Sequence, residues 1–275
     1  MGTAYFIVGL PFHVPQTRSA KSSAATRFNN LLRQLHSEPD LAVASRGMDE
    51  VATALRLGLE RAPIRAPKSA TPISSRASDL IVYCEVTNQE QYSHRYNKPV
   101  WPKGASGVTI GIGYDLGYTT PEALAQDWAG YISTDAINTL SQACGLTGTA
   151  AGDFISELPS VTIDWNTAVK QFSRESQPRY VGATVNALPN TNLLSQDCLG
   201  ALVSLVYNRG ASFSTAGSRF LEMRNIKAHM EQKSFDKVPA EIRAMKQLWT
   251  GDPSLKGLLV RREAEATLFE LGMSQ

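Results

Sequence analysis

The 275-residue chain has few cysteines and histidines, three and four respectively, and neither type clusters. Cys84, Cys144 and Cys198 are an odd number at unrelated spacings, a pattern that gives no disulfide framework. No HxH, HExxH or CxxC occurs, which argues against a zinc hydrolase. A phosphate-binding loop and a dinucleotide fingerprint are also missing from the sequence. We therefore predict a protein that works without a metal or cofactor.

Long apolar runs are missing as well. No stretch approaches the roughly 20 apolar residues of a membrane span, so none is expected. The opening MGTAYFIVGLPF is apolar, but no basic region precedes it, and Pro11 and Pro15 interrupt it. We therefore expect no Sec signal peptide and synthesis in the cytoplasm. Hydrophobic residues at 43% and charged residues at 19% predict a globular protein with a proper core.

The small net charge of +2 hides an uneven distribution. Residues 1–78 carry 10 Lys and Arg against 5 Asp and Glu, and residues 209–262 carry 11 against 5. A basic face of this size attracts anionic polymers, and salt weakens the attraction. A solvated surface without a partner is the alternative interpretation.

A proline-containing stretch divides the chain. Residues 62–78 read APIRAPKSATPISSRAS, with three prolines and no apolar periodicity, which predicts an extended linker. It separates an N-terminal helical segment, residues 1–61, from a main domain, residues 79–275. The N-terminal segment has two helix candidates, Ala20–Leu35 and Met48–Arg61. We find no catalytic residues in it and assign it a role in delivery or partner binding.

The main domain begins with a short predicted helix, Asp79–Val86, with Ser78 and Asp79 as candidate caps. Residues 92–115 are rich in glycine, proline and aromatics, with β-branched residues at 108–110, which predicts a small irregular antiparallel sheet. Helical patterns follow from Thr120 to Leu271, and the one over Gln196–Asn208 is apolar around most of its circumference. The fold class is therefore α+β: a small sheet lobe on a mainly helical lobe.

The residues best suited to catalysis lie at the junction of the first helix and the sheet. Glu85 is near the helix end, and Thr109-Ile110-Gly111-Ile112-Gly113-Tyr114-Asp115 forms a glycine-rich turn. Hydrolysis of a glycosidic bond requires one acid for the leaving oxygen, and a base to activate the attacking water. Glu85, Asp115 and the hydroxyl of Thr109 supply such a set.

Three blocks of sequence together resemble the phage-type lysozymes, which cleave the glycan of bacterial cell walls. The first is the helix ending at Glu85 with TIGIGYDLG (Thr109–Gly117), and the second is ALVSLVYNRGASF (Ala201–Phe213). The third is LKGLLVRREAEATLF (Leu255–Phe269), which is similar to the C-terminal helix of those enzymes. The resemblance covers residues 76–275. It implies a lysozyme-like fold and muramidase activity on the β-1,4 bond between N-acetylmuramic acid and N-acetylglucosamine.

One departure from the common pattern places the chain with the pesticin-like branch. Ordinary phage lysozymes have their catalytic Asp between the Glu and the Thr, yet Val86–Val108 contains no Asp. The first Asp after Glu85 is Asp115, beyond Thr109. The resemblance implies that Glu85 is the general acid, kept protonated by apolar surroundings or a neighbouring carboxylate. Asp115 and Thr109 then hold the water in an inverting mechanism.

Each of these residues also has a structural interpretation. Asp115 suits an Asx-turn before Gly117, and Thr109 suits any strand. Gly111 and Gly113 either let a sugar lie against the backbone or mark a twisted bend. Tyr114 either stacks on a sugar or belongs to the core, and Asn208 either binds an N-acetyl group or caps its helix. Arg261 and Arg262 are expected to be structural ion-pair partners outside the site.

Two other functions remain open: a non-catalytic peptidoglycan-binding domain, and a cysteine peptidase using Cys84 and His94. The expected partner is the peptidoglycan strand in the periplasm or wall of a target or host bacterium, and no nucleic acid is expected. An antibacterial effector, for example of type VI secretion, and a phage endolysin both fit the missing signal peptide. An effector would add a secretion component contacting residues 1–75 and a cognate immunity protein.

Overall fold

The computed structural model describes residues 17–41 and 66–274. The predicted helix Met48–Arg61 lies outside these residues. The N-terminal half contains α1 (Thr17–Ser37), α4 (Ser75–Val86), α5 (Gln89–Gln91), β1 (Thr109–Ile110), β2 (Tyr114–Asp115), α6 (Pro121–Trp128) and α7 (Thr134–Ser141). The C-terminal half contains α8 (Thr149–Phe154), α9 (Trp165–Gln171), α10 (Gln177–Ala187), α11 (Gln196–Arg209), α12 (Leu221–Glu231), α13 (Val238–Ala244) and α14 (Lys256–Met273).

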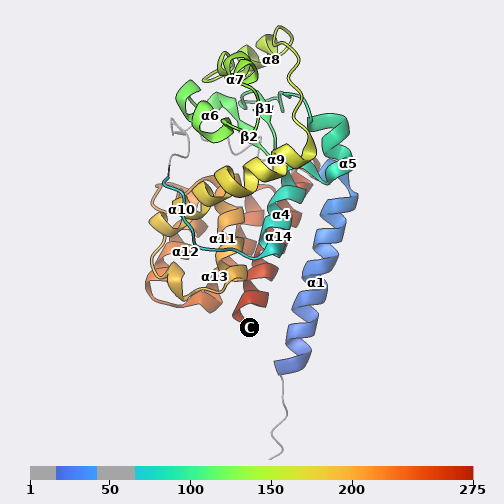
Figure 1. The fold of residues 1–275 in the computed structure, drawn as a ribbon. Helices are drawn as coiled ribbons and strands as arrows, with labels where there is room; N and C mark the ends of the chain where they lie inside the picture. Colours follow the sequence, from blue (N-terminus) through green and yellow to red (C-terminus); the bar gives the residue numbers. More distant parts are fainter. Residues whose placement is uncertain (1–16, 42–65, 275) are drawn as a thin grey trace, which may run out of the picture.

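The elements form two lobes (Figure 1). The hairpin lobe, residues 89–164, contains the two strands with α6, α7 and α8. The helical body contains α1, α4 and α9 to α14. Within the described residues the sheet has two antiparallel strands, with Thr109 opposite Asp115 and Ile110 opposite Tyr114. The α+β class predicted from the sequence is confirmed.

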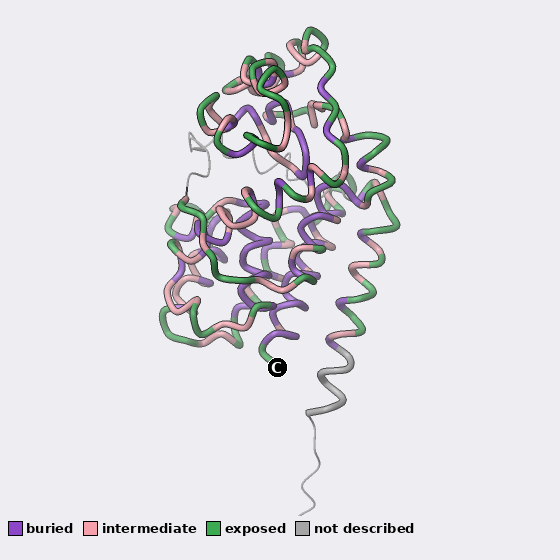
Figure 2. The backbone as a smooth tube through the Cα atoms, viewed as in Figure 1, coloured by how far each residue is buried: buried purple, intermediate pink, exposed green. Residues whose placement is uncertain are grey.

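Two hydrophobic clusters fill the lobes, and α4 and α11 contribute to both. On α11, Leu202 and Leu205 belong to the cluster in the body, while Leu199 and Val203 belong to the cluster under the hairpin. This explains why the α11 sequence is apolar nearly all round, and Figure 2 shows its backbone buried in the middle of the molecule. In the described part of the chain no helix is both long and apolar enough to cross a membrane. The seam between the clusters runs along α4, the helix that carries Glu85.

Helix α4 starts earlier than predicted. Ser74, rather than Ser78 or Asp79, is the N-cap, and its side chain accepts a hydrogen bond from the backbone N–H of Ala77. The helix therefore takes in residues 75–78, which the sequence assigned to the linker. Residues 66–74 have no regular structure and lie against α10, where the Ser69 N–H donates to the carbonyl of Pro178 at 3.0 Å.

The region from Tyr92 to Asp115 contains less sheet than predicted. Residues Tyr92–Tyr96 form a π-helix, and the strands are two residues each, extended by a bridge between Val100 and Thr109. Tyr92 is fully buried and its hydroxyl donates to the carbonyl of Ile163 at 3.0 Å. The tyrosines at the two ends of Tyr92–Tyr96, which the sequence analysis assigned to a sheet, are therefore helical residues that fill the core. Tertiary packing overrides their local preference for strands.

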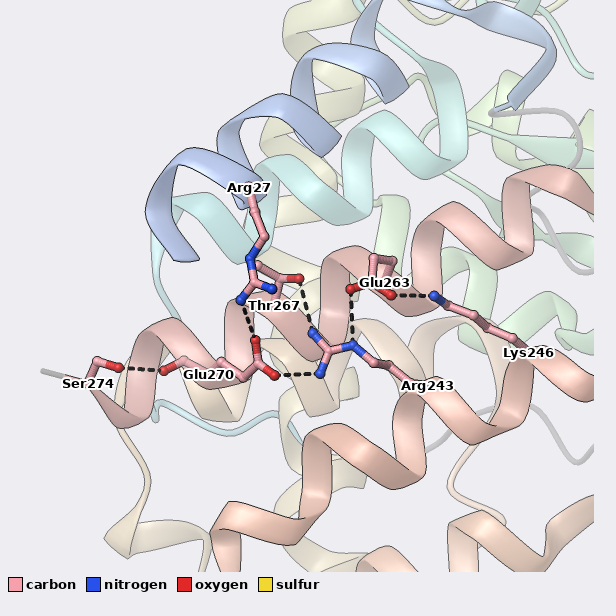
Figure 3. A network of polar contacts seen from close by, with 7 residues as sticks. All are labelled: Arg27, Arg243, Lys246, Glu263, Thr267, Glu270 and Ser274. Atoms are coloured by element: carbon pink, nitrogen blue, oxygen red, sulfur yellow. Dashed lines mark hydrogen bonds and ion pairs between the residues drawn. The ribbon is translucent and has the colours of Figure 1, made fainter. Parts of the chain in front are cut away.

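Helix α1 packs against the body, on α4 and α14, along most of its length (Figure 1). Its buried positions follow a helical repeat: Ala24, Phe28 and Leu35 are buried, with Leu31 and Leu32 partly buried between them. A chain of ion pairs borders the contact (Figure 3). Arg27 pairs with Glu270 of α14, which also pairs with Arg243 of α13. The predicted helix Ala20–Leu35 is confirmed, and it is part of the folded body.

We expect the apolar face of α1, rather than its ion pair, to hold it in place. Phe28→Ala should lower the free energy of unfolding by about 3 kcal/mol, because Phe28 is fully buried and its loss leaves a cavity. Arg27→Ala should cost less than about 1 kcal/mol, since the Arg27 side chain is 56% exposed. Urea unfolding at constant m-value measures both. Equal losses for the two variants would contradict this assignment.

At least five of the eleven basic residues in the stretch 209–262 are buried or paired with carboxylates. Arg209, Arg261 and Arg262 are buried. Arg243 and Lys246 pair with Glu263. Arginine in particular satisfies several acceptors from a buried position. These five charges are balanced or buried within the fold, so the basic surface is smaller than the composition suggests.

Candidate functional site

Glu85 lies in the last turn of α4, at the seam between the two lobes, and is only 7% exposed. Its Oε1 accepts a hydrogen bond from Nη1 of Arg261 at 2.9 Å. Arg261 comes from α14, more than 170 residues later in the sequence, and is fully buried. A carboxyl group in such a setting is held in one orientation, because its apolar surroundings leave the guanidinium as a strong directional partner.

The other carboxyl oxygen of Glu85 faces the hairpin turn. Gly113 has a φ of +71°, and a Cβ atom placed on it would lie 2.8 Å from Oε2 of Glu85. Glycine therefore meets two requirements here, a left-handed backbone and close approach to a carboxyl group. Tyr207 of α11 fixes the turn, because its buried hydroxyl donates to the carbonyl of Ile112 at 2.5 Å. Gly113 thus forms the wall of the Glu85 site that belongs to the hairpin.

Thr109 and Asp115 are directly opposite each other across the two strands. Cross-strand partners point to the same face of a sheet, so the hydroxyl and the carboxylate lie together. Asp115 also has a turn function: its Oδ1 accepts backbone hydrogen bonds from Gly117 at 2.9 Å and Gly107 at 3.1 Å. The Asx-turn interpretation is therefore confirmed. The water-holding role is a separate property that remains a prediction.

Tyr114 and Gly111 belong to the core of the hairpin lobe. The Tyr114 hydroxyl donates to Asp127 at 3.0 Å, and its ring meets the edge of Trp128 at 5.7 Å between centroids. Burial, together with Asp127, raises the pKa of this tyrosine. A Cβ atom on Gly111 would lie 2.7 Å from the Trp128 ring. These contacts favour the structural interpretation of both residues over contact with a sugar.

Asn208 lies in the last turn of α11 and is 4% exposed. The helix ends two residues later at Gly210, which has a φ of +72° and donates its N–H to the carbonyl of Val206. The capping role considered for Asn208 is therefore wrong, since Gly210 performs it. A role in binding an N-acetyl group stays a prediction.

Arg261 is the site residue that the sequence interpretation set aside. The signal for it was present: Arg261 and Glu265 lie four residues apart within an apolar helical stretch, where an unpaired charge is costly. In the structure Arg261 Nε lies 3.2 Å from Glu265, and Nη2 donates to the carbonyl of Ser204 at 3.1 Å. Arg261 is an ion-pair partner, as expected, but one of its partners is Glu85.

The arrangement does not suit a cysteine peptidase. Cys84 is fully buried, and burial raises the pKa of its thiol to about 12. A catalytic cysteine needs a thiolate near neutral pH, and hence the opposite shift. His94 is exposed in the π-helix, whereas Cys84 faces the core of the body. The alternative based on this pair loses its physical support.

Part of the chain matches a known family model. Residues 81–179 match the model of a family described as a domain of unknown function, DUF8812. The matched stretch begins in α4, contains both strands and ends in α10. It therefore contains Glu85, Thr109 and Asp115, but neither α11 nor Arg261. A comparison with curated proteins found no match.

Proposed function

We propose that the protein is a peptidoglycan hydrolase, a muramidase with a lysozyme-like fold of the pesticin-like branch. One observation carries the proposal. The carboxyl group of Glu85 is buried at the end of a helix, against the Gly113 turn of the hairpin that pairs Thr109 with Asp115. A carboxyl group that can take up and donate a proton on one side, and a carboxylate with a hydroxyl on the other, form the set that glycoside hydrolysis by water requires.

The proton that Glu85 transfers is assigned to Oε2. Oε1 is bound by Arg261, whereas Oε2 lies on the hairpin side, close to the backbone of Gly113. In this mechanism Oε2 protonates the glycosidic oxygen, while Asp115 and Thr109 orient a water and the carboxylate of Asp115 accepts its proton. The mechanism is proposed to be inverting, because a water held by Asp115 and Thr109 attacks the anomeric carbon from the face opposite to the leaving oxygen.

Digestion of purified peptidoglycan tests the proposal. The expected result is solubilised fragments with new reducing N-acetylmuramic acid ends, identified by mass spectrometry. Fragments with an anhydro end would instead indicate a lytic transglycosylase. Cleaved peptide bonds would indicate a peptidase, and binding without any cleavage would indicate a non-catalytic wall-binding domain. Each of these three results would overturn the muramidase assignment.

Asp115→Asn separates the turn function of Asp115 from its catalytic one. Asparagine also accepts hydrogen bonds in an Asx-turn, so the contacts with Gly107 and Gly117 should persist. The charge that activates the water is lost, and activity should fall by about 100-fold or more. Thermal unfolding checks that the variant is as stable as the wild type. Retention of full wall-lytic activity by Asp115→Asn would limit Asp115 to the turn.

The cellular setting is proposed on the same basis. The protein acts on the wall as an antibacterial effector or an endolysin, and an effector would meet a secretion component through residues 1–75 and an immunity protein. Helix α1, which belongs to that segment, buries Phe28 and Leu35 against the body. A partner that binds α1 would therefore contact the opposite, outer face of this helix. A pull-down with the full chain from the producing cell's lysate tests for both partners.

A further inference from the structure

A pocket lies in the hairpin lobe, outside the Glu85 site. Its volume is about 430 Å³, which is within the usual range for small-molecule sites. One wall is the segment from Pro159 to Asp164 with Thr167 of α9, and the other is the segment from Tyr131 to Ser133 with one face of α7. None of Glu85, Thr109 and Asp115 lines it.

The lining of this pocket combines a buried apolar floor with a polar rim. Val161 and Ile163 are buried, whereas Asp135, Ser160 and Asp164 are exposed. Carboxylates and hydroxyls dominate the rim, and no Lys, Arg or His of the described residues lines the pocket. Asp135 and Asp164 are the charged residues of the lining, and their carboxylates favour a cation over an anion.

The walls of the pocket are held by contacts that do not involve a ligand. The Ile163 N–H donates to the carbonyl of Asn97 at 2.8 Å, and its own carbonyl accepts from Tyr92. Asp164 caps α9 by accepting from the Thr167 N–H at 3.0 Å and from its hydroxyl at 2.6 Å. These hydrogen bonds lower the pKa of Asp164, so its carboxylate is charged at neutral pH. A preformed pocket binds without paying for its own ordering.

We propose that this pocket binds a small hydroxyl-rich cation, such as a sugar carrying a protonated amine. Hydroxyls of the ligand exchange hydrogen bonds with Ser160 and its neighbours on the rim, and the ammonium group lies between Asp135 and Asp164. The apolar face of the ligand covers Val161 and Ile163. This assignment is independent of the wall-hydrolase proposal, since it involves no residue of the Glu85 site.

Titration of the isotope-labelled full chain with three sugars, followed by NMR, tests this assignment. Below neutral pH, glucosamine should shift the backbone amides of the pocket and bind about 3- to 5-fold more tightly than glucose or N-acetylglucosamine, with the difference shrinking in high salt. The three sugars share a ring and differ in charge. Equal binding of all three, or no saturable shift with glucosamine, would overturn the proposal.

Matched variants test which carboxylates of the protein attract the ammonium group of glucosamine. Asp164→Asn keeps an N-cap residue as good as Asp while removing its charge, so the wall should stay folded. Asp164→Asn and Asp135→Asn should each weaken glucosamine binding by about 2-fold, so that the two together remove most of its advantage over glucose. Asp153→Asn removes the same charge from α8, away from the pocket lining, and should change nothing. If Asp153→Asn weakened glucosamine binding by the same factor, the cause would be the net charge of the protein, and the proposed site would be overturned.

Discussion

Glu85→Gln should lower wall-lytic activity by about 100- to 10,000-fold, the usual contribution of a general acid, and leave the fold intact. Glutamine has the shape of glutamate, and its amide oxygen can still accept the hydrogen bond from Arg261. What disappears is the proton that the leaving glycosidic oxygen must receive. Initial rates of peptidoglycan solubilisation, measured with circular dichroism and thermal unfolding of the same samples, separate lost chemistry from lost folding.

Glu90→Gln is the matched control for this experiment. Glu90 is five residues further along and exposed on α5, so the substitution makes the same chemical change outside the site. Its activity should stay within about two-fold of the wild type, in keeping with a surface substitution. If Glu85→Gln retained comparable activity, or if both variants lost it equally, Glu85 would not be the acid.

The helical framework could be predicted from the sequence because its signals are local. The predicted Gln196–Asn208 is observed as Gln196–Arg209, and the helical pattern predicted from Thr120 begins there, with Thr120 as the N-cap of α6. Periodicity and capping are properties of a few neighbouring residues, so one sequence reveals them. The start of α4 was misplaced because Ser74, Ser75 and Ser78 all suit a cap, and only packing decides among them.

The candidate site could be predicted only where it depends on short-range pattern. Glu85 and the Gly113 turn come from two short motifs, and the structure brings their carboxyl group and backbone together. The partner of Glu85 could not be located in this way. Arg261 is on the last helix, and nothing local to it indicates which of the chain's carboxylates it reaches. The Tyr114 contact with Asp127 is hidden for the same reason.

Position 261 should have the largest effect on stability. Arg261→Met should lower the free energy of unfolding by about 3–5 kcal/mol, the usual cost of breaking a buried ion pair from one side. Methionine fills much of the volume of the arginine stem, so lost packing contributes little. The cost arises because Glu85 and Glu265, buried with Arg261, lose a cationic partner. Urea unfolding at constant m-value measures the change.

A double-mutant cycle shows how much of the destabilisation by Arg261→Met depends on the interaction between Arg261 and Glu85. In the Glu85→Gln background the carboxylate at position 85 is already absent, so Arg261→Met should cost at least about 1 kcal/mol less than it does in the wild type. Arg27→Met breaks the exposed pair with Glu270 and should cost under about 1 kcal/mol in either background. Additive losses in the cycle would mean that Arg261 stabilises the protein mainly through Glu265 and Ser204. The orientation of the Glu85 carboxyl group would then depend on contacts other than the one with Arg261.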